Sequence, residues 1–487
     1  MSNFMLKFKF GLKSKLGLIP GTSRLETEEL ALNKEYEEFL SYKRSNEPQR
    51  FLELEEIVTS QDFIDHKKHI NNQRFKDSDA YRKLAEYNSL KKSPRFRGYF
   101  RFVNSGAFED FQKLDNSNEI KEFEALGKKF ESADYKKAEP EKYKDYKARK
   151  KSPEYRAYYK LRNSKDLEHF RELDGSPELE KFRELEKYIE SDEFKETRDY
   201  LKSGDKFKKT PEYQQLLEYR ELKKSPKIKW YFKLKKSGRF DELVKWKLVF
   251  SDEFTGKELD KDKWLTRFFW GANLLKQGYS LAADRHLYTE GRNIDIENNT
   301  LRLYTRKESV TGQAWDPALG FFPKDFEYTS GLINTGESFR QKYGAFEAKV
   351  RMHTSPVVYH AFWMLSDKMV PHIDIFRFMG KKNNRIELNS YWTEEGDTKE
   401  IRRNSDTVGG INFSRGFFIF RLEWYPDRLV WKVNNTIVKV ETEGVPKDPM
   451  YILFSSGVVD GNGENGLPTS LDLDWVRCYE YTGGKKE

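Results

Sequence analysis

A unit of 12 residues recurs in the first half of the chain and restricts that half to short helices. Each copy begins with Ser or Thr, often followed by Pro, and has apolar residues three, six and nine positions later. Ser or Thr caps the free backbone N–H groups at a helix start, and Pro fits the first turn. The apolar triple forms one stripe on a helix of about two and a half turns, which must pack on its neighbours to be stable. Nine close copies begin at Ser93, Ser105, Ser117, Ser152, Ser164, Ser176, Thr210, Ser225 and Ser237.

The apolar positions of these units are mostly aromatic, and we interpret them as a core between helices rather than a ladder for a ligand. Residues 1–246 carry a net charge of +10, but acidic and basic residues alternate there, as in KFRELEK. Alternating charge is typical of a solvated helix face and not of a phosphate-binding track. The array is therefore expected to be a scaffold for self-association or for a protein partner, and nucleic acid is not an expected partner.

A different pattern begins at residue 247, from which the net charge is −1 and Gly and Trp become frequent. Short apolar or alternating runs are separated by Gly, Asn and Asp, which is typical of a β-sandwich or jelly roll. Asn434-Asn435 is expected to turn two such runs into a hairpin. The runs are LRLYTR, AFEAKVRM, FFIFRLEWY, RLVWKVNN, MYILFSSG and LDLDWVRCYEY.

These patterns predict a multi-domain α + β chain, in which an array of short α-helical repeats precedes a β-jelly-roll sandwich. In the first residues, apolar side chains from Phe4 to Leu12 alternate with Lys, which predicts one strand or a docking arm, flexible or bound to a partner. A segment lying on a membrane surface is the alternative. The expected parts are an arm at 1–30, helical repeats at 31–246, the sandwich at 247–482 and a tail at 483–487.

The sequence also bears on the compartment. No apolar run approaches the roughly 20 residues that a membrane-spanning helix needs. Lysines interrupt the apolar residues of the N-terminus, so it lacks the continuous apolar core of a secretory signal. Cys478 is the single cysteine and excludes an intrachain disulfide, which suits a reducing compartment. A cytoplasmic or otherwise non-secreted location without a membrane span is therefore expected.

The order of motifs in the β half resembles the family 16 glycoside hydrolases, which are laminarinase-like jelly rolls. FSDEF and the later Trp264 look like the opening segment of that family, and SGLINT and YGAFEAKVRM look like its central strands. AFWML, from Ala361 to Leu365, resembles the strand that places a Trp under the sugar. FRLEWYPDRLVWKVN and LDLDWVRCYEY resemble its late hairpin and closing strand. The resemblance implies a concanavalin-like sandwich over residues 247–482 and a polysaccharide as partner.

The strand that carries the chemistry in that family is altered here. Family members have E-x-D-x-x-E after the AFW strand, in which the first Glu is the nucleophile, the Asp tunes it and the second Glu is the acid/base. This chain reads HIDIFR, with His372, Asp374 and Arg377 at the three positions. Retaining hydrolysis needs two carboxyl groups across the sugar bond, and Arg cannot donate a proton near neutral pH. We interpret the row as an inactive site held by internal ion pairs and hydrogen bonds, in which a bulge turns Arg377 onto the face of the other two.

Loss of catalysis leaves sugar binding open, because sugar sites combine aromatic faces with polar groups. By resemblance to the floor Trp of the family, Trp363 is the first candidate. A packing role is an equal expectation for the others, and the aromatic segment from Trp315 to Tyr328 is expected to form a loop beside the site. The further candidates are His360, Trp270, Trp315 and Trp392.

Many family members hold a structural Ca²⁺. The resemblance implies that Glu253 and Asp474, with backbone carbonyls, would be its ligands here, and oxygen ligands suit that ion. No cofactor is required by this interpretation.

Three functions remain open from the sequence. The first is a non-catalytic protein derived from a glycosidase, which binds glycans or assembles with the helical repeats as scaffold. The second is an active endo-glycosidase on β-glucan-like polysaccharides with relocated carboxylates. Glu387 is a candidate for that role, whereas Glu347, in the YGAFE motif, is interpreted as structural. The third is a structural protein that forms filaments or particles and has no glycan role.

Overall fold

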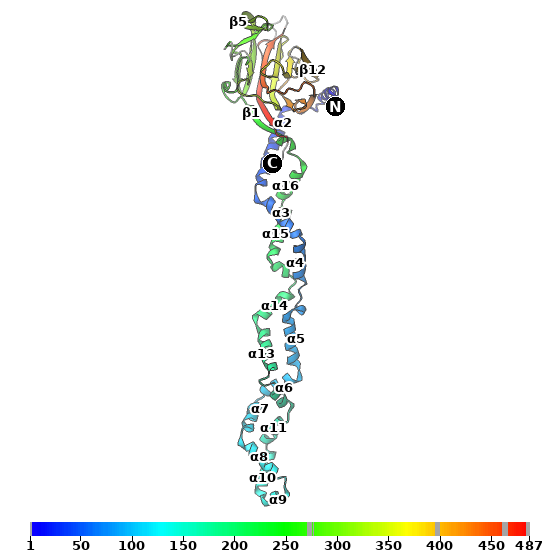
Figure 1. Ribbon diagram of the computed structural model, residues 1–487, viewed down its shortest axis with the longest axis vertical. Helices are drawn as coiled ribbons and strands as arrows, with labels where there is room; N and C mark the ends of the chain where they lie inside the picture. The colour runs from blue at the N-terminus through cyan, green and yellow to red at the C-terminus, as the bar shows by residue number, and fades with distance from the viewer. Residues whose placement is uncertain (1, 270–274, 276, 395–399, 460–465, 484–487) are drawn as a thin grey trace. The chain divides into compact units, whose positions relative to one another are not determined.

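The chain folds into short helices followed by a β-sandwich (Figure 1), which confirms the predicted fold class. It divides into two compact units, one of residues 1–44 and 230–487 and the other of residues 45–229. The sandwich unit therefore also contains residues 1–44 and 230–246. The sequence pattern instead predicts that these residues belong to an arm that ends at residue 30 and to helical repeats that end at residue 246. The computed structural model describes residues 2–269, 275, 277–394, 400–459 and 466–483.

Most helices of the repeats begin at the predicted Ser or Thr, whereas the helix expected from Ser105 begins after Gly106. Ser93 Oγ accepts a hydrogen bond from Phe96 N at 3.3 Å, and Ser176 Oγ accepts one from Leu179 N at 3.2 Å. The unit that begins at Ser237 forms only a four-residue helix, because the first strand starts at its third apolar position. The helices are α1 (Asn3–Lys15), α2 (Thr22–Lys43), α3 (Asn46–Thr59), α4 (Gln61–Asn72), η1 (Phe75–Asp77), α5 (Asp79–Lys92), α6 (Pro94–Val103), α7 (Ala107–Asp115), α8 (Asn118–Lys129), α9 (Ala133–Ala138), α10 (Pro140–Lys151), α11 (Pro153–Arg162), α12 (Lys165–Leu173), α13 (Pro177–Glu190), α14 (Asp192–Lys202), η2 (Lys206–Lys209), α15 (Pro211–Lys224), α16 (Pro226–Ser237) and α17 (Asp241–Val244).

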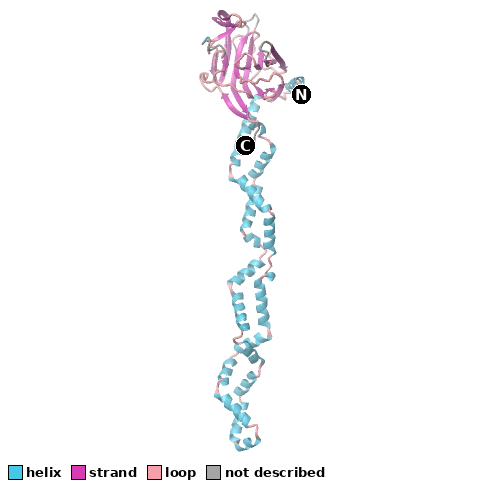
Figure 2. Ribbon diagram, in the orientation of Figure 1, coloured by secondary structure: helices cyan, strands magenta, loops and turns pink. Residues whose placement is uncertain are grey.

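Within residues 45–229 the helices form two strings that run in opposite directions and fold back at α9 and α10 (Figure 2). Successive partners are α3 with α15, α5 with α13, α6 with α12, α7 with α11 and α8 with α10. Aromatic rings meet across each pair, which confirms that the aromatic positions form the core of this unit. The ring pairs include Phe51–Tyr219, Phe63–Phe207, Phe75–Phe194, Tyr87–Phe182, Tyr99–Phe170, Phe111–Tyr158 and Phe123–Tyr146.

The strands form two sheets. In the described residues, the larger sheet has the order β15-β14-β13-β8-β17-β5-β6-β3, with β1 beside β17 and with β2 and β4 beside β5. The smaller sheet has the order β12-β11-β10-β9-β16-β7. The strands are β1 (Trp246–Asp252), β2 (Tyr279–Leu281), β3 (His286–Tyr288), β4 (Ile294–Glu297), β5 (Thr300–Asp316), β6 (Gly320–Ser330), β7 (Leu332–Asn334), β8 (Gly344–Met352), β9 (Val358–Leu365), β10 (His372–Met379), β11 (Arg385–Thr393), β12 (Ile401–Gly409), β13 (Phe418–Trp424), β14 (Leu429–Val433), β15 (Thr436–Glu441), β16 (Tyr451–Val458) and β17 (Thr469–Tyr481).

The main core lies between the two sheets. Phe346 and Phe420 of the larger sheet and Phe362 and Phe376 of the smaller one belong to the same buried cluster. The predicted turn at Asn434-Asn435 is present, and both residues have positive φ, as a tight two-residue hairpin requires. The segment expected as a loop beside the site is instead part of the β5–β6 hairpin, in which Trp315 pairs with Phe321.

The N-terminal segment is helical and is not the predicted strand. The helix α1 packs against β15 and β12 within the sandwich unit, and its Phe10 is fully buried in the main core. Ser14 Oγ donates to the carbonyl of Gly410 at 2.7 Å, and Val440 N donates to Asn3 Oδ1 at 2.9 Å. In the described part of the chain, no helix has the length and apolar character needed to cross a membrane.

Candidate functional site

The strand β10 carries His372, Asp374 and Arg377 on one face of the smaller sheet, the face that points away from the larger sheet. A register shift separates Asp374 from Arg377 opposite β11 and Asp374 from Phe376 opposite β9. The predicted bulge is therefore present. It leaves Phe376 fully buried in the core between the sheets and turns Arg377 outward. We call this outward side of β9, β10, β11 and β16 the site face.

Asp374 is the centre of a buried hydrogen-bond network. His372 Nε2 lies 2.8 Å from its Oδ1, and Asn389 Nδ2 donates to its Oδ2 at 2.7 Å. The residue is only 2% exposed. Burial raises the pKa of the Asp374 carboxyl, but His372 and the hydrogen bonds from His372 and Asn389 outweigh burial, so the pKa lies below its ordinary value. Each oxygen therefore has a partner within the chain, and the carboxylate is ionised and almost fully buried.

Arg377 lies over an aromatic ring at the other end of this row. Its guanidinium carbon is 4.1 Å from the centroid of the Tyr359 ring. Burial lowers the pKa of Arg377, but Tyr359 and Asp374 raise it by a larger amount. The pKa therefore lies above its ordinary value, and the guanidinium stays charged. Tyr359 and Tyr288 place their hydroxyl oxygens 3.4 Å apart. Position 377 of the site face is thus held by a cation.

Glu387 is the remaining carboxylate of this neighbourhood. It lies directly opposite Arg377 in the register of β10 and β11 and is half-buried. Since opposite residues of an antiparallel pair share a face, Glu387 belongs to the site face. In the fully described strands β9, β10 and β11, the site face carries two carboxylates, Asp374 and Glu387, and the first is already bonded. Glu347 lies in the other sheet, where Arg421 and Tyr479 bind it, which confirms its structural role.

Trp363 is a partly buried aromatic residue of the site face, as are Tyr359 and Tyr391. It is the register partner of Asp374, and its Nε1 donates to Ser455 Oγ at 3.2 Å. Its ring centroid is 4.9 Å from that of His372, and His372 is 5.0 Å from Tyr391. Trp363, His372 and Tyr391 therefore form a continuous row of rings across three strands. The rings are tilted to one another, by 32° between Trp363 and His372 and by 53° between His372 and Tyr391, and each can offer its face to the C–H surface of a sugar.

Trp315 reaches the same neighbourhood from the larger sheet. It packs, partly buried, on the cluster of Phe268, Tyr279 and Tyr288, which Trp363 also borders. The structure thus brings Trp315 and Trp363 to one aromatic cluster. Their spacing in the sequence does not predict that they lie close together.

Two other predicted sugar-binding residues lie elsewhere. His360 is fully buried on the core side of β9, where its ring atoms bond Ser456 Oγ at 2.7 Å and the carbonyl of His353 at 2.9 Å. Burial lowers the pKa of His360 to about 4. Trp392 follows Tyr391 in β11 and so points to the opposite side, where it packs on Gly444. Both predictions are wrong, because strand alternation sets these side chains away from the site face. Trp270 lies outside the described residues.

The sequence reasoning missed the supporting residues of the site. Asn389, Tyr391 and Arg403 come from β11 and β12, and Arg403 Nη2 donates to Asn389 Oδ1 at 3.3 Å. Tyr359 comes from β9. The residue types in LNSYW and RRNSD do not indicate which of them faces β10, because that depends on the register between strands.

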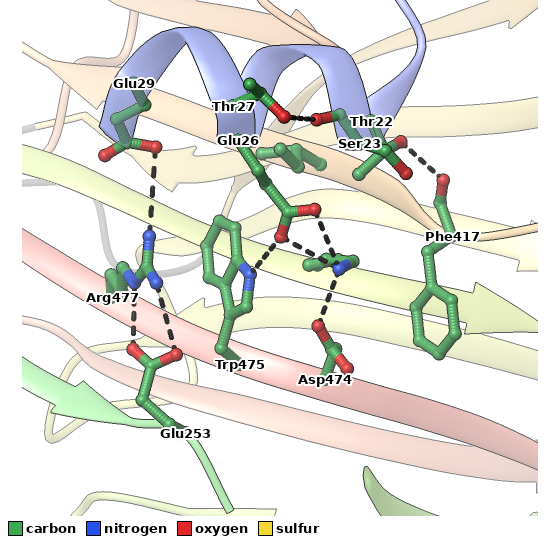
Figure 3. Close-up of polar contacts among 12 residues, drawn as sticks. Thr22, Ser23, Glu26, Thr27, Glu29, Glu253, Phe417, Asp474, Trp475 and Arg477 are labelled. Carbon is green, nitrogen blue, oxygen red and sulfur yellow. Dashed lines mark hydrogen bonds and ion pairs between the residues drawn. The ribbon is translucent and has the colours of Figure 1, made fainter. Parts of the chain in front are cut away.

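The two carboxylates expected to bind Ca²⁺ are held by cations of the chain itself (Figure 3). Arg477 donates to both oxygens of Glu253, at 2.9 and 3.1 Å. Lys349 Nζ lies 2.7 Å from Asp474 Oδ2 and donates to both oxygens of Glu26 at 2.8 and 3.0 Å. Ca²⁺ takes roughly six to eight oxygen ligands. The residues do not fit the ion, and no group of three His, Cys, Asp or Glu suited to a metal occurs in the described ranges.

Chelation is therefore expected to leave the sandwich intact. In thermal unfolding followed by Trp fluorescence, we expect EDTA and excess CaCl₂ to change Tm by less than about 1 °C, because an ion stabilises only a state that binds it. Lys349→Gln is the variant to compare with the unaltered chain in the same measurement, because it removes the cation that Glu26 and Asp474 share. A rise of several degrees with CaCl₂ in the unaltered chain would establish a metal site that these residues do not explain.

The comparisons with known proteins concern the sandwich. Residues 282–477 match the family model Glycosyl hydrolases family 16. The chain is 26% identical over 248 residues to the Endo-1,3-1,4-beta-glycanase ExsH of Rhizobium meliloti (strain 1021), which covers 47% of this chain and 51% of that protein. It is 23% identical over 275 residues to the Glucan endo-1,3-beta-glucosidase A1 of Niallia circulans, covering 48% of this chain and 38% of that protein.

Among solved structures, the chain is similar to the endo-beta-1,3-glucanase from Pyrococcus furiosus. The identity is 26% and the TM-score 0.40, with 48% of this chain and 95% of that chain covered. The chain spans about half or less of the length of the two curated relatives, and each alignment covers less than half of this chain.

Proposed function

We propose that the sandwich, in which residues 282–477 match the family model of glycosyl hydrolases family 16, binds a β-linked glucan without hydrolysing it. The single observation that carries the proposal is the network around Asp374. Its two oxygens are bonded by His372 and Asn389, and Arg377 occupies the place of the acid/base. Hydrolysis with two carboxylates needs a pair of available carboxyl groups, and β9, β10 and β11 do not supply such a pair.

The binding part of the proposal rests on the row of Trp363, His372 and Tyr391. These rings offer apolar faces, while Glu387 and Arg377 offer an acceptor and donors for hydroxyl groups at the edge of the row. The relatives are named for acting on 1,3- and 1,3-1,4-linked β-glycans. A soluble β-1,3-glucan and a mixed-linked β-1,3-1,4-glucan are therefore the probes to use.

Trp363→Ala is expected to weaken glucan binding by at least about tenfold, because it removes the largest ring of the row. Isothermal titration with both glucans measures the affinity. Tyr481→Ala is the matched control, since it removes a 37%-exposed ring of the other sheet and should bind as the unaltered chain does. Equal affinity of the Trp363 variant and the control would show that the site face is not the glucan site, and no binding by the unaltered chain would remove the proposal.

A reducing-sugar assay on the same glucans separates the proposal from an active endo-glycosidase. We expect no turnover. The position of Glu387 opposite Arg377 favours this carboxylate as the relocated group if turnover is found. Turnover that Glu387→Gln abolishes would establish the active enzyme in place of the binding protein.

A further inference from the structure

The first helix of the chain exposes an apolar row. Phe4, Phe8 and Leu12 follow one another at four-residue spacing and are 73%, 61% and 48% exposed. Residues four apart lie on one side of a helix, so these side chains form a single strip. Met5 of the same helix, and Leu16 and Leu18, which follow its end, are also exposed, at 44%, 61% and 61%. Within the described part of the chain, no other stretch of similar length gathers as many exposed large apolar side chains.

The opposite row of α1 fixes the helix on the sandwich. Leu6 is half-buried, and Phe10, four residues later, is fully buried in the main core. Lys7 pairs with Asp406 of β12, and Gly11 meets Gly410 so closely that a Cβ on Gly410 would lie 3.3 Å from the Gly11 Cα. The helix therefore packs on the core of its own unit with the side opposite the strip, and the strip itself faces away from that core.

The segment that carries the strip has charges of one sign. Residues 1–25 contain Lys7, Lys9, Lys13, Lys15 and Arg24 and no Asp or Glu. Lys9, Lys13 and Lys15 are exposed on α1 beside the apolar strip. Aromatic and Leu side chains on one side of a helix with lysines alongside are the combination that binds the interface of an anionic bilayer.

We propose that α1 docks the sandwich unit on an anionic lipid surface. Phe4, Phe8 and Leu12 enter the boundary between headgroups and acyl chains, and the lysines meet the lipid phosphates. The helix lies in the plane of the interface and does not cross the bilayer. This proposal is independent of the glucan-binding proposal, because it uses no residue of the site face.

A second copy of the chain fits the strip less well. Two α1 helices packed on each other by a two-fold axis would bring Lys13 and Lys15 of both copies together, and residues 1–25 contain no acidic residue to balance them. An anionic surface neutralises the same charges. Charge complementarity therefore favours lipid as the occupant.

Co-sedimentation of the full chain with vesicles tests the proposal. We expect binding to phosphatidylcholine vesicles that contain about 30% phosphatidylglycerol, and at least about tenfold weaker binding to pure phosphatidylcholine or at about 0.5 M NaCl. Phe4→Glu with Phe8→Glu should reduce binding by at least about tenfold. Leu319→Glu with Ile401→Glu is the matched control, since these side chains are 74% and 57% exposed in the sandwich and should not matter.

The fold of each variant is checked by its Trp fluorescence and Tm, which should be unchanged because the altered side chains are exposed. Lys9→Glu with Lys13→Glu and Lys15→Glu keeps the apolar strip and should also lose binding to the anionic vesicles. The proposal is overturned if the unaltered chain binds neither vesicle or both equally, or if the Phe4 and Phe8 variant binds as the control does. Self-association that this variant abolishes, seen by analytical ultracentrifugation without lipid, would assign the strip to a second copy instead.

Discussion

Asp374→Ala is expected to lower the free energy of unfolding of the sandwich unit by about 3–5 kcal/mol at pH 7. The reason is that the buried groups bonded to Asp374 lose the negative charge that they bind. His372 and Asn389 both lose a hydrogen bond, and the side chain of His372 is only 22% exposed. The unit is monitored by Trp fluorescence during denaturation with urea. Asp427→Ala is the matched control, since Asp427 is a 69%-exposed carboxylate of the same unit and should change stability little.

The same interaction gives a pH dependence. The pKa of the Asp374 carboxyl is lower in the folded chain than in the unfolded chain, so its contribution to stability is complete above the unfolded value of about 3.9. The contribution is lost as the pH falls through the lower folded value. The stability difference between the unaltered chain and Asp374→Asn should therefore be largest near neutral pH and shrink in acid. A difference that stays constant down to pH values below that of the unfolded carboxyl would show that the charge of Asp374 is not what stabilises the site.

Phe182→Ala is expected to destabilise the helical unit of residues 45–229 by about 3–5 kcal/mol, the usual cost of emptying a buried Phe site. Phe182 is 1% exposed, and its ring centroid lies 5.0 to 5.2 Å from those of Tyr87, Phe96 and Phe100 on the other string. Each helix is too short to persist alone, so losing a contact between the strings should unfold neighbouring helices with it.

The two units can be followed separately in this experiment, because all ten Trp residues lie outside residues 45–229. We expect the helical signal in circular dichroism to melt earlier while the Trp fluorescence transition stays in place. Phe182→Leu should recover most of the loss, and Leu52→Ala, at a 41%-exposed site of α3, should have little effect. Equal shifts of both transitions would mean that the units unfold as one.

Much of the helical array is local and was therefore predictable. Ser93 and Ser176 cap helices because a hydroxyl two or three residues ahead of free N–H groups needs no distant partner. The pairing of the two strings was not predictable. The aromatic positions of all units are alike, so the sequence pattern does not indicate that Phe111 meets Tyr158 or that Phe182 meets Tyr87.

The error at the N-terminus has a physical cause. Apolar residues at positions 4, 6, 8, 10 and 12 satisfy the period of a strand, but they also contain two rows with a spacing of four. Both structures are compatible with this pattern. Burial of Phe10 on the sandwich, together with the bonds of Asn3 and Ser14, selects the helix. Those partners lie about four hundred residues later in the chain.

By itself the sequence determined the two kinds of structure, the helix starts, the β-hairpin at Asn434-Asn435 and the strand that carries His372, Asp374 and Arg377. Each of these depends on residues close together in the chain. Only the folded structure shows that Asn389 donates to Asp374, that Glu387 lies opposite Arg377, and that His360 and Trp392 point away from the site face. Those outcomes depend on the register between strands, where a shift of one residue moves every side chain to the other face.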